Sequence, residues 1–181
     1  MAENEFDELL RQETVFERII GAEEAVKKTA DALFAGADEK TVKAEVAEIM
    51  QRKKIAGRDA KAAFRVLKEH WVSRFKSEKP LLAKVLGSIG TVGLSWKAVE
   101  ETEKRVVFRV SNGKNCALLR ACKHDVKKSE KFCRAHFKHQ IPFDAESTLV
   151  LRAVNPRLKW ELVKMRNHPA DHCEYAIVLA D

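Results

Sequence analysis

Apolar residues recur every three or four positions through the first 80 residues, the spacing of one face of an α-helix. The pattern predicts four helices: one before Gly21, one over residues 22–36, one beginning after Asp38 and one beginning after Asp59. Asp38 and Asp59 are in position to cap their helices, because a carboxylate there accepts hydrogen bonds from the unpaired amides of the first turn. We therefore expect residues 1–80 to form a helical N-terminal region that packs on the rest of the chain.

The period changes to two at residue 94 and again at residue 158, which predicts one β-hairpin over residues 94–111 and a second over residues 158–179. Residues 116–140 between them have a helical pattern, with a break near Asp125 and with Ser129 as the expected cap of the second helix. Residues 81–181 are thus predicted to be an α+β domain. Its core is an antiparallel sheet of about four strands with helices on one face.

The composition is that of a globular chain, with 45% hydrophobic and 34% charged residues. No apolar run is long enough to predict a membrane span, and the acidic first residues do not have the pattern of a signal peptide. Four cysteines are too few for a disulfide scaffold, so we expect reduced thiols and a cytoplasmic location.

The positive charge is concentrated in the second half of the chain. Residues 101–181 carry 16 basic and 10 acidic side chains, whereas residues 1–100 carry 18 and 17. An excess of this kind is typical either of a solvated basic surface or of a site for an anionic partner. Because the sequence has no nucleic-acid-binding motif, it favours a small carboxylate or another anionic ligand over nucleic acid.

Thiols and imidazoles also gather in the second half, which holds all four cysteines and five of the six histidines. These side chains serve as ligands of zinc or iron, and also as the nucleophile and base of thiol enzymes. The alternative is that the cysteines are small buried core residues, since an unpaired cysteine is among the most frequently buried residue types.

Chain position selects four residues as one candidate site: Cys116, Cys133, His136 and Cys173. Cys116 lies where the first hairpin leads into a helix, and Cys173 begins the last strand. Cys133 and His136 are three residues apart, on one face of a helix. We expect the four to meet at one end of the sheet, as catalytic groups or as metal ligands. Cys122 is predicted to be a packing residue.

Several short motifs carry a family resemblance. They are Asn115 and Cys116 after a strand, Cys133 on a later helix, the segment 154–159, and residues 171–175 with Cys173 between acidic and aromatic neighbours. Residues 94–181 resemble the L-2-amino-thiazoline-4-carboxylic acid hydrolase family. A weaker similarity is to 4-vinyl-reductase-like ligand-binding domains, in which cysteines near the sheet hold a metal.

The first resemblance implies a hydrolase that opens a carboxylate-bearing ring containing sulfur and nitrogen, with Cys116, Cys133, Cys173 and His136 as the reacting groups. An arginine would hold the carboxylate, and the chain offers Arg120, Arg134 and Arg166. The second implies a non-catalytic, sensor-type domain that binds a metal or a small ligand at the same residues. Either function is compatible with a homo-oligomer, and a basic nucleic-acid-binding protein is the third alternative.

Overall fold

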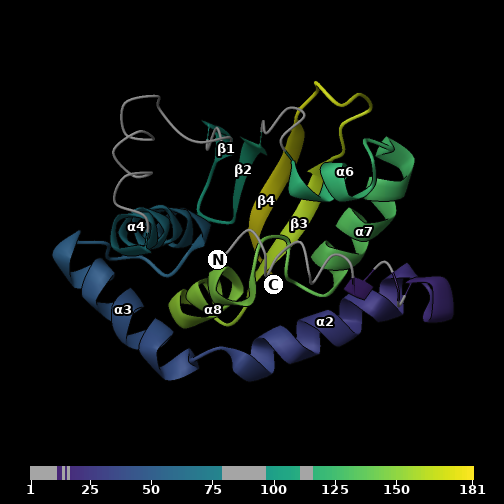
Figure 1. Ribbon diagram of the computed structural model, residues 1–181. Helices are drawn as coiled ribbons and strands as arrows, with labels where there is room; N and C mark the ends of the chain where they lie inside the picture. Colours follow the sequence, from purple (N-terminus) through teal and green to yellow (C-terminus); the bar gives the residue numbers. More distant parts are fainter. Residues whose placement is uncertain (1–11, 14, 16, 79–96, 111–115) are drawn as a thin grey trace.

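The computed structural model describes residues 12, 13, 15, 17–78, 97–110 and 116–181. Residues 12, 13, 15 and 17–20 are helical and precede the elements labelled in Figure 1. These elements are, in order, α2 (Ala22–Gly36), α3 (Glu39–Arg52), α4 (Ala60–Glu78), β1 (Lys97–Glu101), β2 (Arg105–Val110), α6 (Ala117–Ala121), α7 (Val126–Lys138), α8 (Ala145–Val154), β3 (Leu158–Lys164) and β4 (Cys173–Leu179).

The sheet has four strands in the order β1-β2-β4-β3, and every neighbouring pair is antiparallel. Each predicted hairpin is present, and the pairing of β2 with β4 joins the two into one sheet. Residues 94–96 of the first predicted hairpin lie outside the described residues. The α+β fold with an antiparallel sheet is therefore confirmed.

The helices lie in two layers on the sheet. In the first layer, α4 contacts β2 and β4, whereas α7 and α8 contact β3. In the second layer, α2 packs on α7 and α8, and α3 packs on α4 and α8. Figure 1 shows α2 and α3 running along the outside of α8. None of the described helices has both the length and the apolar composition of a membrane span.

In the N-terminal region, the helix caps are the ones that the sequence predicts. The Asp38 carboxylate accepts a hydrogen bond from the Thr41 amide at 3.0 Å, and that of Asp59 accepts one from the Ala62 amide at 2.8 Å. Both predicted caps are confirmed.

The predicted cap of α7 was wrong. Asp125 caps this helix by accepting a hydrogen bond from the Lys128 amide at 2.9 Å. Ser129 lies inside the helix, where it is buried and its hydroxyl donates to the Val126 carbonyl oxygen. A serine hydroxyl can bond a backbone carbonyl one turn earlier, so its presence near a helix start does not by itself identify the cap.

Helix α8 was not predicted. Seven of its ten residues are buried, and they lie on all sides of the helix. A helix surrounded by protein needs no polar face, so it lacks the amphipathic period by which helices are recognised in a sequence. The sequence feature that marks the start of this helix is its cap. The Asp144 carboxylate accepts a hydrogen bond from the Ser147 amide at 2.6 Å.

Aromatic rings form the centre of the larger core. Phe108 of β2 is fully buried, and its ring centroid lies 5.3 Å from that of Phe64, 6.1 Å from that of Tyr175 and 6.3 Å from that of Trp160. Phe64 comes from α4, so one ring holds a helix of the N-terminal region against three strands of the sheet.

Gln140 secures the edge strand β3. Its side-chain oxygen accepts a hydrogen bond from the Trp160 amide at 2.7 Å, and its side-chain nitrogen donates to the Trp160 carbonyl oxygen at 3.0 Å. An edge strand otherwise presents unpaired backbone groups, and here one side chain pairs with two of them.

Replacing the central ring should cost much of the stability. We expect Phe108→Ala to lower the free energy of unfolding by about 3–5 kcal/mol, because it leaves a cavity among three other rings. Urea unfolding followed by circular dichroism measures this. Val99→Ala, at a 44% exposed position on β1, is the control and should change it by less than about 0.5 kcal/mol.

The assignment of Asp125 as the cap of α7 is also testable. Asp125→Ala should cost about 1 kcal/mol of stability, because it removes the only side-chain cap that the described residues give this helix. Ser129→Ala should cost less, since the alanine keeps the helical backbone and loses one local hydrogen bond. Equal losses in urea unfolding would contradict the assignment of the cap.

Candidate functional site

Strand pairing fixes the position of one predicted site residue, Cys173. Cys173 is the first residue of β4 and pairs with Val110, the last residue of β2. The chain leaves β2 at this end and returns to the described residues at Cys116, which immediately precedes α6. Cys116 is half-buried, and Cys173 is 2% exposed.

The third thiol comes from a helix. Cys133 lies on α7, is 6% exposed, and is close enough to Tyr175 for the two groups to influence each other's pKa. Tyr175 lies two residues after Cys173 on the same face of β4, which the helices cover. Its ring centroid is 4.6 Å from that of Phe137, which comes from the next turn of α7. Packing of α7 on this strand therefore positions Cys133.

Arg166 is the cationic member of the group. It lies in the loop between β3 and β4, is 3% exposed, and its Nε donates a hydrogen bond to the Cys173 sulfur at 3.4 Å. Its Nη1 donates to the Pro169 carbonyl oxygen at 3.1 Å. A guanidinium is one of the groups that can stabilise a neighbouring thiolate.

Electrostatic interactions connect all these groups. Burial, then the neighbouring Cys173 and Cys116, raises the pKa of the Cys133 thiol to about 12. Burial and the three cysteines also hold the pKa of Tyr175 well above its usual value. The sulfurs of Cys173 and Cys116 raise the pKa of Arg166, whereas its burial opposes that shift. At neutral pH, Cys133 and Tyr175 are therefore protonated and Arg166 is charged.

His136 faces a different part of the molecule. Its Nδ1 lies 2.7 Å from the Phe132 carbonyl oxygen, and its Nε2 lies 3.3 Å from Oε1 of Glu13 in the helical residues that precede α2. Glu13 is 2% exposed, and its second carboxylate oxygen has no hydrogen-bond partner among the described residues. Both ring nitrogens of His136 are thus engaged by groups other than the thiols.

Cys122 has the packing role that its position predicts. It is 6% exposed in the smaller core cluster, between α2 and α7, together with Val26 and Phe132. Burial raises the pKa of this thiol to about 11.

A metal centre would require several of these side chains to converge on one point. Across the residues with described placement, no three histidine, cysteine or acidic side chains are grouped so that they could hold a metal ion. A zinc or iron centre needs such a group, with bonds of about 2–2.3 Å. Cys116, Cys133, His136 and Cys173 therefore do not fit a metal centre in this structure.

The three candidate arginines have different surroundings. Arg134 is exposed and its Nη2 lies 2.6 Å from the Glu130 carboxylate. Arg166 contacts Cys173. Arg120 is exposed on α6, one turn after Cys116, and no ion pair within the described structure engages it. Of the three, Arg120 can accept a carboxylate without giving up an ion pair.

Sequence reasoning did not select Tyr175, and it left Arg166 as one of three arginines. In the sequence, Tyr175 lies two residues after Cys173 in a predicted strand, and this spacing places both side chains on the same face. Arg166 lies in a loop without periodicity, so only the folded chain shows which sulfur it contacts.

Comparisons of the chain with protein-family models, with curated proteins and with solved structures find no match.

The buried thiols should make stability depend on pH in alkaline solution. Cys133, Cys122 and Tyr175 each have a raised pKa in the folded state. Unfolding lets them ionise near their ordinary values, about 8.5 for cysteine and 10 for tyrosine. The free energy of unfolding should therefore fall as the pH rises from about 8.5 toward 11.

Urea unfolding at a series of pH values, with a reductant present, measures this fall. Cys133→Ala should make it shallower because one of the three groups is removed, and Val99→Ala should leave it unchanged. An unchanged slope in Cys133→Ala would show that the thiol ionises equally in both states.

Proposed function

We propose that this protein is a small-molecule hydrolase that opens a carboxylate-bearing ring containing sulfur and nitrogen, with Cys173 as its nucleophile. The contact between the Arg166 guanidinium and the Cys173 sulfur carries the proposal. The resemblance of residues 94–181 to L-2-amino-thiazoline-4-carboxylate hydrolases supplies the substrate class.

The environments of the thiols support Cys173 over Cys133. A nucleophilic cysteine acts as the thiolate, which a neighbouring cation stabilises. Cys173 has such a cation at 3.4 Å, whereas the pKa of Cys133 is about 12 and this thiol stays protonated at neutral pH. Cys133 and Tyr175 then act as the uncharged wall of the site. Cys116, which is half-buried, is the most exposed of the three thiols.

The proposed reaction has two steps. The Cys173 thiolate adds to the amidine-like ring carbon, the ring carbon–sulfur bond breaks, and the departing sulfur takes a proton from water. The hydroxide left by that proton transfer then adds to the same carbon, its proton passes to the adjacent nitrogen, and the Cys173 thiolate leaves. One water is consumed, and the product is an open-chain thiol whose former amidine carbon carries a carbonyl oxygen. Arg120 holds the substrate carboxylate, and His136, which is engaged by Glu13, takes no part.

Ring opening of L-2-amino-thiazoline-4-carboxylate by the full chain, followed by proton NMR, tests the proposal. Turnover is expected in the wild type. Cys173→Ser should lose at least about 10³-fold in kcat/KM, as expected when a nucleophile is removed. Cys122→Ser is the matched control, because Cys122 is equally buried but lies in the other core cluster, and it should retain activity.

Substitutions of Arg166 and Arg120 distinguish an effect on the reactivity of Cys173 from an effect on binding of the substrate carboxylate. Arg166→Gln should slow alkylation of Cys173 by iodoacetamide at fixed pH without slowing that of Cys116. Arg120→Gln should raise KM with little effect on kcat, since it removes ground-state binding of the carboxylate.

Full activity in Cys173→Ser would refute the assigned nucleophile. Saturable binding of this substrate without turnover would refute the hydrolase and favour the non-catalytic ligand-binding domain. The protonated state of Cys133 and Tyr175 is the observation that favours that second function, because neither can attack a substrate at neutral pH.

A further inference from the structure

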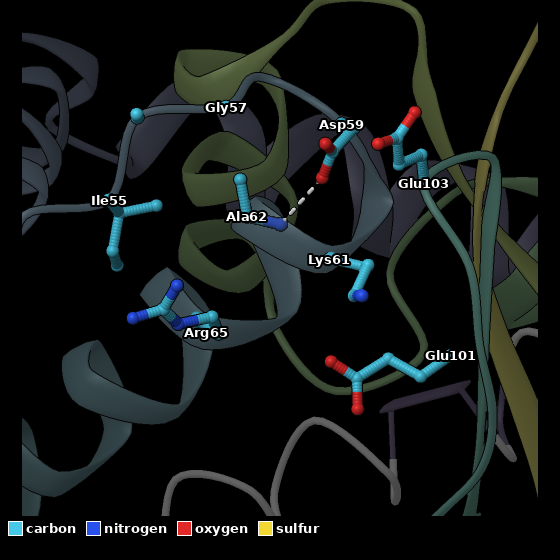
Figure 2. A pocket seen from close by; sticks show the side chains of 9 residues that line it. Ile55, Gly57, Asp59, Lys61, Ala62, Arg65, Glu101 and Glu103 are labelled. Atoms are coloured by element: carbon cyan, nitrogen blue, oxygen red, sulfur yellow. Dashed lines mark hydrogen bonds between the residues drawn. The ribbon is translucent and has the colours of Figure 1, made fainter.

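A surface pocket of about 410 Å³ lies at the other end of the sheet, between the start of α4 and the β1–β2 hairpin. Its apolar floor includes Ile55 and Ala62, which are 6% and 4% exposed. Figure 2 shows side chains from both elements lining it. The volume is within the range of small-molecule sites, about 300–1,000 Å³.

Charged side chains of both signs line this pocket. Lys61 and Arg65 come from α4, and Glu101 and Glu103 come from the end of β1 and the following turn. All four side chains belong to exposed residues, and among the described residues none of them forms an ion pair. Nearby charges do pair: Lys53 Nζ, for example, lies 2.9 Å from a carboxylate oxygen of Glu69.

Side chains of like charge are neighbours in this pocket. Lys61 and Arg65 are four residues apart on one helix, a spacing at which like charges destabilise a helix by about 0.2–0.5 kcal/mol. Asp59, Glu101 and Glu103 contribute three carboxylates to the lining. Because no ion pair joins them to Lys61 or Arg65 among the described residues, a molecule carrying both charges would place each of its charges beside groups of opposite sign.

The pocket walls are fixed to one another by the backbone. The Ala60 amide, at the start of α4, donates a hydrogen bond to the Glu103 carbonyl oxygen at 2.8 Å. The Asp59 carboxylate is held by the Ala62 amide, which it caps at 2.8 Å. Gly57 allows the chain to pass close to this carboxylate, since a Cβ there would lie 2.9 Å from its free oxygen. The fold therefore fixes the relative position of the two backbone segments that line the pocket.

We propose that this pocket binds a free α-amino acid with a small aliphatic side chain. Its carboxylate is held by Arg65 and Lys61, of which the arginine can form a bidentate pair. Its ammonium group lies against Glu101 and Glu103, and its side chain covers Ile55 and Ala62.

The site is separate from the thiols. Glu101 pairs with Val106 near one end of β2, whereas Val110 pairs with Cys173 at the other end. A protein without the hydrolase activity would therefore still carry this pocket.

Isothermal titration of the full chain with L-leucine or L-valine, at low ionic strength, tests the proposal. At least one should bind saturably. Two derivatives separate the charges: the N-acetyl derivative keeps only the carboxylate, and the amide keeps only the ammonium group. Each should bind at least tenfold more weakly than the parent amino acid.

Single substitutions of pocket residues test whether the amino acid binds in this pocket. Arg65→Gln and Glu103→Gln should each weaken it at least tenfold. Lys40→Gln and Glu48→Gln, which remove exposed charges of the same sign on α3, should not. Thermal unfolding checks that the four variants are equally folded.

Absence of saturable binding by both amino acids would overturn the proposal. So would equal affinity for the N-acetyl derivative, which would show a site for anions alone. Equal affinity in Arg65→Gln and in wild type would place the amino acid elsewhere on the protein.

Discussion

The pairing of β2 with β4 is the contact on which the rest of the structure depends. It joins strands about 70 residues apart in the chain and makes one sheet of two hairpins. The same register places Phe108 opposite Tyr175, and the two rings pack on the helices that cover the sheet. Burial of aromatic surface at this point offsets the conformational entropy of closing so long a loop.

The register also decides which chemistry-bearing groups come together. Because Val110 lies opposite Cys173, the segment that follows β2 begins at the thiol end of β4. Tyr175 then packs on α7 and brings Cys133 to the same face. A shift of one residue would turn Cys173 and Tyr175 to the opposite face of the sheet and disperse the group.

The two ends of the sheet differ in how charge is balanced. At the thiol end, one buried guanidinium contacts the Cys173 sulfur, and burial raises the pKa values of the neighbouring Cys133 and Tyr175. At the hairpin end, exposed cations and anions line one pocket, and among the described residues they form no ion pair with one another. Low dielectric makes the first arrangement sensitive to every neighbour, whereas solvent screening allows the second to exist without a large cost in stability.

Local features of this protein follow from the sequence alone. The caps at Asp38 and Asp59 and the two hairpins involve residues close together in the chain, so period and cap chemistry identify them. The tertiary structure decided the strand order, the buried helix α8, and the partners of His136 and Arg166. The strand order, the burial of α8 and the contact of His136 with Glu13 depend on segments distant in the chain, whereas the contact of Arg166 with Cys173 depends on a loop without periodicity. Hence the sequence marked the cysteines as candidates, and the folded conformation of the β3–β4 loop determined which of them lies beside a buried cation.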